Sequence, residues 1–126
     1  EFYPDITKNL VSEAQTHCKN LDIKNDIFIV NGSLEIPTLI AMKIRKKKYD
    51  AVVALGCIIK GQTKHFDLIA SAITDSLLQL SITNAIPITN AVLTCDNMKQ
   101  AVMRSPKEMN RSKEAIDSAL SILKNF

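Results

Sequence analysis

The chain has 126 residues, which is enough for one domain and too few for two. Hydrophobic residues make up 46% and charged residues 23%, an ordinary globular balance, and no apolar run approaches the roughly 18 residues that a membrane span needs. The net charge of +3 is mild and argues against a nucleic-acid-binding protein.

Helical and strand patterns alternate along the chain. Apolar residues spaced three and four apart predict helices over residues 4–20, 37–44, 67–80, 96–104 and 111–124. Short apolar runs predict strands over 26–30, 51–55 and 87–93, and the unbroken second run is typical of a strand covered on both faces. This alternation predicts right-handed βαβ units, and therefore an α/β fold in which a parallel sheet lies between helices.

The first predicted element is a helix, whereas folds of this class normally begin with a strand. Three strands also make a thin sheet for four or five helices. We therefore expect a leading strand, absent from this sequence, to complete the sheet.

The cysteines Cys18, Cys57 and Cys95 lie far apart and show no CxxC spacing. Their odd number predicts reduced thiols and a cytoplasmic protein. No Cys or His pair has the spacing of metal ligands, so we expect no zinc site.

A basic run over residues 45–48 carries much of the positive charge. It is compatible with a nucleic-acid patch. The favoured interpretation is that these residues end a helix, where cations complement the negative end of the dipole.

The segment from Gly56 to Asp67 follows a buried strand and precedes a helix, the position at which open α/β sheets bind ligands. Its glycine spacing nearly matches a phosphate-binding P-loop, but Gln62 stands where the phosphate-contacting lysine belongs, which argues against an NTPase. Backbone N–H groups of Gly61, Gln62 and Thr63 can still hold an anion. An ordinary strand-to-helix turn is the alternative.

His65 stands at the start of the following helix. The positive end of the helix dipole disfavours imidazolium, so we expect a neutral ring that can take and return a proton. A solvated or helix-capping histidine is the alternative, and His17 is interpreted as a surface residue.

Two further clusters are candidates for ligand binding. Arg104 is followed by Lys107 and Arg111, and a guanidinium suits phosphate; the alternative is a set of cations that end a helix. Glu35 precedes a helix, which it could cap, or it could accept hydrogen bonds from a polyol.

Several motifs together resemble the lumazine synthase family, in family order and at near-family spacing over almost the whole chain. They are Leu34-Glu35-Ile36-Pro37, residues 49–56, Gly61-x-Thr63-x-His65-Phe66-Asp67, Pro87, Leu93-Thr94 and Gln100-Ala101-x-x-Arg104.

The resemblance implies a flavodoxin-like three-layer α/β/α sandwich with a four-stranded parallel sheet, whose first strand ends just before Phe2. The implied enzyme is a cytoplasmic transferase of riboflavin biosynthesis. It joins 5-amino-6-ribitylaminopyrimidinedione to 3,4-dihydroxy-2-butanone 4-phosphate, without a metal or organic cofactor. The implied assembly is built from homopentamers, some of which form decamers or sixty-subunit shells, with active sites between adjacent subunits.

Carried over by position, the resemblance assigns the pyrimidine substrate to residues of one subunit: Phe2, Ser33, Leu34, Glu35, Ile58 and Ile59. Phe2 would stack on the ring, which Ile58 and Ile59 would flank. Ser33, Leu34 and Glu35 would line the ribityl chain, with Glu35 accepting from its hydroxyls.

The phosphate substrate is assigned to backbone donors of Gly61, Gln62 and Thr63, with His65 as the proton shuttle. The neighbouring subunit would supply Asn90, Arg104 as the phosphate clamp, and Arg111 near the ring carbonyl.

The sequence departs from the family pattern at some of these positions. Leu34 stands where Phe is often found, and Asn90 where Phe is common. These departures leave a second hypothesis open, a non-catalytic relative that binds lumazine or riboflavin. A protein whose purpose is the assembled shell is a third.

Overall fold

The protein is described by a computed structural model, in which residues 4–60, 64–97, 99, 103 and 111–126 are placed. The elements, in chain order, are α1 (Pro4–Asn20), the 3₁₀ helix η1 (Ser33–Glu35), α2 (Ile36–Lys46), β1 (Val52–Ile59), α3 (Phe66–Asn84), β2 (Ile88–Cys95) and α5 (Arg111–Lys124).

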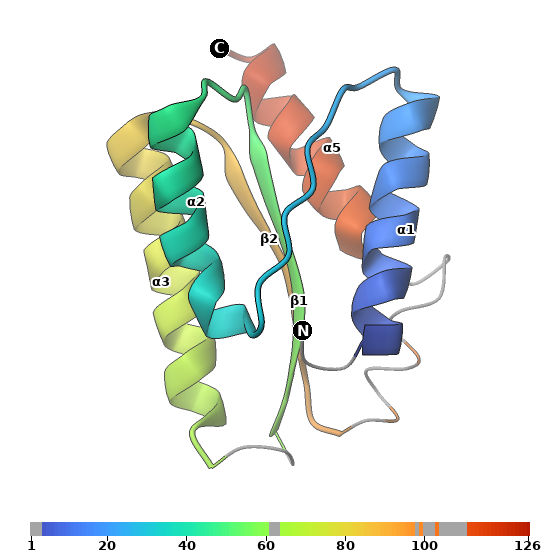
Figure 1. Cartoon of the computed structure of the whole chain (residues 1–126), viewed down its shortest axis with the longest axis vertical. Coiled ribbons are helices and arrows are strands. Elements are labelled where there is room, and N and C mark those ends of the chain that lie inside the picture. The colour runs from blue at the N-terminus through green and yellow to red at the C-terminus, as the bar shows by residue number, and fades with distance from the viewer. Residues whose placement is uncertain (1–3, 61–63, 98, 100–102, 104–110) are drawn as a thin grey trace.

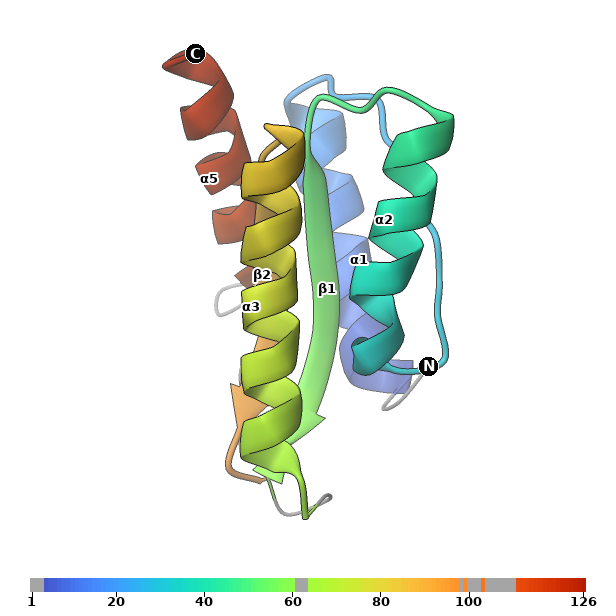
Figure 2. The ribbon, with the colours of Figure 1, turned by 90° about the vertical axis from the view of Figure 1, so that its left-hand side faces the viewer.

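The described elements form three layers (Figure 1). β1 and β2 make a parallel sheet, α2 and α3 cover one face of it, and α1 and α5 cover the other, as the turned view in Figure 2 also shows. The predicted α/β class and the flavodoxin-like three-layer arrangement are confirmed.

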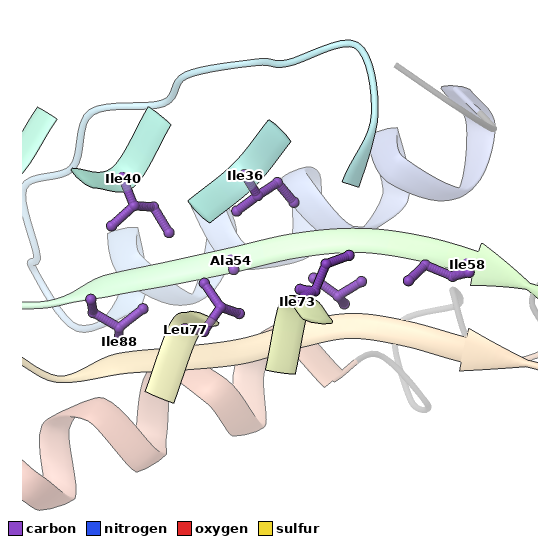
Figure 3. Close-up of a cluster of buried hydrophobic side chains, with 8 residues drawn as sticks. Ile36, Ile40, Ala54, Ile58, Ile73, Leu77 and Ile88 are labelled. Carbon is purple, nitrogen blue, oxygen red and sulfur yellow. The ribbon is translucent and has the colours of Figure 1, made fainter. Parts of the chain in front are cut away.

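One core lies between the sheet and helices α2 and α3 (Figure 3). Its buried members are Ile36, Ile40, Ala54, Ile58, Ile73, Leu77, Ile88 and Val92. α3 supplies Ile73 and Leu77, which are almost fully enclosed. Burying each such side chain stabilises the fold by about 1.5–3 kcal/mol relative to leaving it in water.

A second core lies on the opposite face, beneath α1. It joins Ile6 and Leu10 of α1 to Cys57, Ile59, Leu93 and Cys95 of the two strands. A strand that is buried on both faces reads as a continuous apolar run, which is why β1 could be recognised. All three cysteines are buried thiols outside any disulfide, and burial raises the pKa of the Cys18 thiol.

The predicted helices over 4–20 and 111–124 coincide with α1 and α5, whereas α3 is longer than predicted. The helix was predicted to end at Leu80, but α3 continues to Asn84. Its C-cap residue is Ala85, which has a left-handed φ of 51°. Ser81 explains the extension, because its hydroxyl donates to the Ile86 carbonyl at 2.6 Å and accepts the Ile88 N–H at 3.3 Å. The helix end is thereby joined to the start of β2.

The prediction that the second strand ends at residue 55 was wrong. β1 continues to Ile59, because Gly56–Ile59 pair in register with Val92–Cys95 of β2. Because residues 56–59 lie beside a parallel strand, they continue the ladder of backbone hydrogen bonds. Gly56 therefore lies within β1 and does not end it.

The predicted strand over 26–30 was also wrong, since this segment is not part of the sheet. It runs extended beside β1 (Figure 1), and side chains hold it in place. The Asp26 carboxylate accepts from Lys47 at 3.0 Å and from Tyr49 at 2.9 Å, and the Lys43 ammonium lies 4.0 Å from the Phe28 ring centroid. The sheet of the described residues therefore has two strands instead of three.

The basic run does end a helix, as favoured from the sequence. Arg45 and Lys46 lie in the last turn of α2, and Lys47 follows as its C-cap residue. Within the described part of the chain, no helix combines the length and the apolar character that a membrane crossing requires.

Candidate functional site

Several predicted site residues meet at the carboxyl end of β1. β1 ends with Ile58 and Ile59, His65 precedes α3, and η1 contacts both β1 and α3. Figure 2 shows the start of α3 and the end of β1 at the same end of the molecule. This is where parallel α/β sheets bind ligands.

Ser33 lies directly against the backbone of Gly56. A Cβ atom built on Gly56 would lie 2.8 Å from Ser33 Oγ, closer than real Cβ atoms come to such a neighbour. The absent side chain at position 56 therefore lets η1 approach the middle of β1. Gly56 is thus a packing residue of the site.

Glu35 lies at the N-cap position of α2, but its carboxylate makes no capping hydrogen bond. It turns back over Gly32, where a Cβ would lie 2.9 Å from Glu35 Oε2. The capping role considered from the sequence is therefore wrong. The carboxylate stays exposed and can accept hydrogen bonds from a ligand.

Leu34 and the two isoleucines of the site differ in exposure. Leu34 is 55% exposed, a large apolar side chain open to solvent beside Glu35. Ile58 is buried in the core beneath α2 and α3, and Ile59 in the core beneath α1. Among Leu34, Ile58 and Ile59, only Leu34 has a large exposed apolar surface in the single chain.

His65 is the N-cap residue of α3, with φ −111° and ψ 29°. Its side chain is exposed and makes no capping hydrogen bond to the helix, while its carbonyl accepts the Ile69 N–H at 2.9 Å. The helix-capping alternative is therefore wrong. An accessible imidazole beside a helix N-terminus can exchange protons with a bound molecule.

Asn90 and Arg111 lie on elements other than η1 and α3, which carry Ser33 and His65 at their starts. Asn90 is exposed on β2, and its Oδ1 accepts the Val92 N–H at 2.8 Å on the strand edge away from β1. Arg111 begins α5, with Nε 3.9 Å from Glu114 Oε2. α5 covers the face opposite α3 (Figure 2), so one chain does not group Arg111 with His65. Asn90 lies on the α3 side of β2, the side that Ile88 and Val92 also face. The remaining predicted site residues, Phe2, Gly61, Gln62, Thr63 and Arg104, lie outside the described residues, as does most of the helix predicted over 96–104.

Two polar contacts were not predicted from the sequence. His17 was interpreted as a surface residue, but it is half-buried and its Nε2 lies 2.7 Å from Asp117 Oδ1, joining α1 to α5. Asp26 has a lowered pKa, chiefly because Lys47 and then Tyr49 donate hydrogen bonds to its carboxylate. Both contacts join segments that are distant in sequence, so no local sequence pattern predicts them.

The fold and site define an α/β protein with its candidate ligand site at the carboxyl end of a parallel strand, between η1 and a helix N-terminus. The family model described as 6,7-dimethyl-8-ribityllumazine synthase matches residues 1–126. The chain belongs to this family.

Curated relatives agree with this assignment. A 6,7-dimethyl-8-ribityllumazine synthase of Methylorubrum populi is 38% identical over 97% of this chain and 76% of its own length. Proteins with the same name from Limosilactobacillus reuteri and Corynebacterium kroppenstedtii are each 38% identical. The match to the Limosilactobacillus reuteri protein covers 83% of this chain and 70% of that protein. The match to the Corynebacterium kroppenstedtii protein covers 95% of this chain and 76% of that protein.

Proposed function

We propose that this chain acts as a 6,7-dimethyl-8-ribityllumazine synthase, a transferase of riboflavin biosynthesis. It condenses 5-amino-6-ribitylaminopyrimidinedione with 3,4-dihydroxy-2-butanone 4-phosphate. An amine of the pyrimidine attacks the ketone and water leaves as an imine forms. Inorganic phosphate is then eliminated, and ring closure releases a second water.

The observation that carries this proposal is the match of the family over the whole chain, together with relatives that bear the enzyme's name. The described part of the site supports it. Ser33, Leu34 and Glu35 lie together beside β1, and His65 stands at the helix that follows β1.

Each group has a role that its chemistry permits. Glu35 accepts from the ribityl hydroxyls, and Leu34 covers an apolar part of the substrate. His65 moves protons during imine formation and elimination, which is typically worth about 10²–10⁴-fold in rate. Holding the two substrates together contributes more, about 7–11 kcal/mol of the barrier.

The phosphate group is bound by Arg104 and by backbone donors of Gly61, Gln62 and Thr63. A guanidinium presents paired donors to phosphate, and successive backbone N–H groups form an anion-binding concavity. Phe2 contacts the pyrimidine ring, whereas Ile58 and Ile59, which are 6% and 1% exposed, support the site from within the two cores. No metal or organic cofactor takes part.

Asn90, Arg104 and Arg111 come from a neighbouring subunit, so the active unit is a homo-oligomer built from pentamers. α3 supports self-association, because its large apolar side chains Leu68, Leu78 and Ile82 are 69%, 56% and 65% exposed. Leu78 and Ile82 lie one turn apart and form an exposed apolar pair, of the kind that interaction surfaces contain. The three buried cysteines, which form no disulfide, support a reducing cytoplasmic location.

The test is to mix the purified chain with both substrates and to follow phosphate release and lumazine absorbance. We expect both signals to rise together. Saturable binding of the pyrimidine without phosphate release would favour the non-catalytic carrier. Leu78→Asp tests the assembly, because a charge in the apolar pair of Leu78 and Ile82 should shift the sedimentation profile to smaller species, whereas Gln79→Asp beside it should not.

A further inference from the structure

The described α-helices all end at one end of the molecule, the end where β1 and β2 begin (Figure 1). The candidate ligand site lies at the opposite end, where β1 stops and α3 starts (Figure 2). The last carbonyl groups of each helix give its end about half a negative charge. Polar backbone groups therefore gather at a second place, away from the candidate site.

The end of α2 is less closed by its own chain than the end of α1. After α1, the N–H groups of residues 21–23 return to carbonyls of its last turn at 2.8–3.1 Å. After α2, the Lys47 N–H donates to the Lys43 carbonyl at 3.1 Å, but the carbonyls of residues 44–46 accept no hydrogen bond from another described residue. These carbonyls are left to water or to a partner that brings N–H donors.

The same helix end is strongly basic. Residues 43–48 contain five cations and no carboxylate. This run holds more positive charge than the net +3 of the whole chain, so the remaining residues together are net negative. A helix end needs only about half a charge to balance its dipole, so most of the positive charge of this run exceeds that need.

Two of these cations are engaged within the chain. Lys47 donates to the Asp26 carboxylate at 3.0 Å, and the Lys43 ammonium lies 4.0 Å from the centroid of the Phe28 ring. The other three are exposed and form no ion pair with another described residue: Arg45, Lys46 and Lys48. These three side chains and the carbonyls of residues 44–46 are named the α2 basic surface.

The α2 basic surface fits a peptide better than a nucleic acid. A peptide rich in Asp and Glu supplies carboxylates for the cations and N–H donors for the carbonyls, whereas a phosphodiester backbone has no N–H donors. Proteins that bind single-stranded nucleic acid also offer aromatic rings on which bases stack. Here Lys43 and Lys47 already occupy one face of the Phe28 and Tyr49 rings, at 4.0 and 5.2 Å from their centroids.

We propose that the α2 basic surface binds an acidic segment of a partner protein, presented as the first turn of a helix. Free N–H groups and favourably placed carboxylates occur together in such a turn. When the turn docks end to end on α2, its N–H groups meet the carbonyls of residues 44–46 and its carboxylates meet Arg45, Lys46 and Lys48. This binding does not depend on the activity proposed above, because the surface and His65 lie at opposite ends of the molecule.

The test titrates the 126-residue chain into a fluorescent helical peptide that begins Ser-Glu-Glu-Asp-Glu and has blocked ends, with anisotropy as the readout. We expect saturable binding that weakens by about tenfold or more when salt rises from about 20 mM to about 200 mM. Changing the three exposed cations together should weaken binding at low salt by about tenfold or more. This variant is Arg45→Gln, Lys46→Gln, Lys48→Gln.

The matched control removes the same charge from exposed lysines on other parts of the chain. It is Lys8→Gln, Lys64→Gln, Lys113→Gln. Binding by this control should stay within about twofold of the unaltered chain, because distant exposed charges are screened. Circular dichroism checks that both triple variants are folded.

Two further measurements test where the peptide lies and what it donates. Amide chemical shifts of residues 44–49 should move during the titration, whereas those of residues 65–69 should not. A peptide N-methylated on its first three glutamate and aspartate residues keeps every carboxylate but loses the N–H groups, and should bind about tenfold more weakly.

Three results would overturn the proposal. The first is an absence of saturable peptide binding, or equal binding by the two triple variants. The second is equal binding of the N-methylated peptide, which would leave a charge effect without the carbonyl contacts. The third is binding of an oligothymidylate of equal charge, or of vesicles that contain phosphatidylserine, as tight as that of the peptide, because the surface would then suit another class of partner.

Discussion

The hydroxyl of Ser33 lies so close to Gly56 that a Cβ at position 56 would approach within 2.8 Å of it. This contact fixes η1 against β1, and so fixes the neighbouring Leu34 and Glu35 relative to the start of α3. The shape of the candidate site therefore depends on a residue that has no functional group.

Gly56→Ala should displace Ser33 and move η1. We expect a loss of about 1–3 kcal/mol in the free energy of unfolding, the cost typical of overpacking. The KM for the pyrimidine substrate should rise, because Glu35 and Leu34 move with η1. Urea denaturation and steady-state kinetics measure the two effects. Adding Ser33→Ala removes the crowded oxygen, and the double variant should recover most of the stability; equal stability of the single and double variants would contradict this account.

His65→Ala and Arg104→Ala should lower activity by different amounts and through different kinetic parameters. Loss of an acid–base group should lower kcat by about 10²–10⁴-fold yet leave measurable turnover. Arg104→Ala should reduce activity further, mainly through a higher KM for the phosphate substrate, because its paired donors are lost. Initial rates of phosphate release over a range of both substrates separate these cases. Arg45→Ala, an exposed arginine at the end of α2, is the charge control, and equally small effects at 65 and 104 would refute the assigned roles.

Asp26→Asn should lower thermal stability over a defined range of pH. The pKa of Asp26 is lowered by hydrogen bonds from Lys47 and Tyr49, so its contribution is present above about pH 4, the ordinary carboxyl pKa, and is lost as pH falls below it. The pKa values of Lys47 and Tyr49 are raised, chiefly by their hydrogen bonds to Asp26. Their contribution is therefore lost as pH rises above about 10.

The Tm difference between the Asp26→Asn variant and the unaltered chain should accordingly be largest between these limits and should shrink on both sides. Scanning calorimetry across the pH range measures it. Asp50→Asn is the control, since Asp50 forms no ion pair with another described residue. A Tm difference that does not change with pH would show that the aspartate acts by packing alone.

Leu77→Ala should destabilise the protein by about 2–5 kcal/mol, because Leu77 is 2% exposed and its removal leaves a cavity between α3 and the sheet (Figure 3). Gln79→Ala on the exposed side of the same helix should change stability by less than about 0.5 kcal/mol. Chemical denaturation measures both variants. Similar losses for the two would contradict the observed burial.

The sequence by itself determined the bounds of α1 and α5 and the family. The bounds of α1 and α5 were predictable because a helix is closed by hydrogen bonds within its own segment, so local spacing contains the needed information. Ser33, Glu35 and His65 could be proposed as site residues because the motifs around them resemble those of the family. Gly56 belongs to one of these motifs, but its packing role was not evident from the sequence.

The tertiary structure decided everything that depends on a distant partner. The apolar runs at 26–30 and 56–59 look alike, but only the second meets β2 and becomes a strand. The pairing of His17 with Asp117 and the closeness of Ser33 to Gly56 likewise bring together atoms from separate parts of the chain. A strand or a contact needs a partner whose position is set by the packing of the whole chain, and residues near it in sequence do not specify that position.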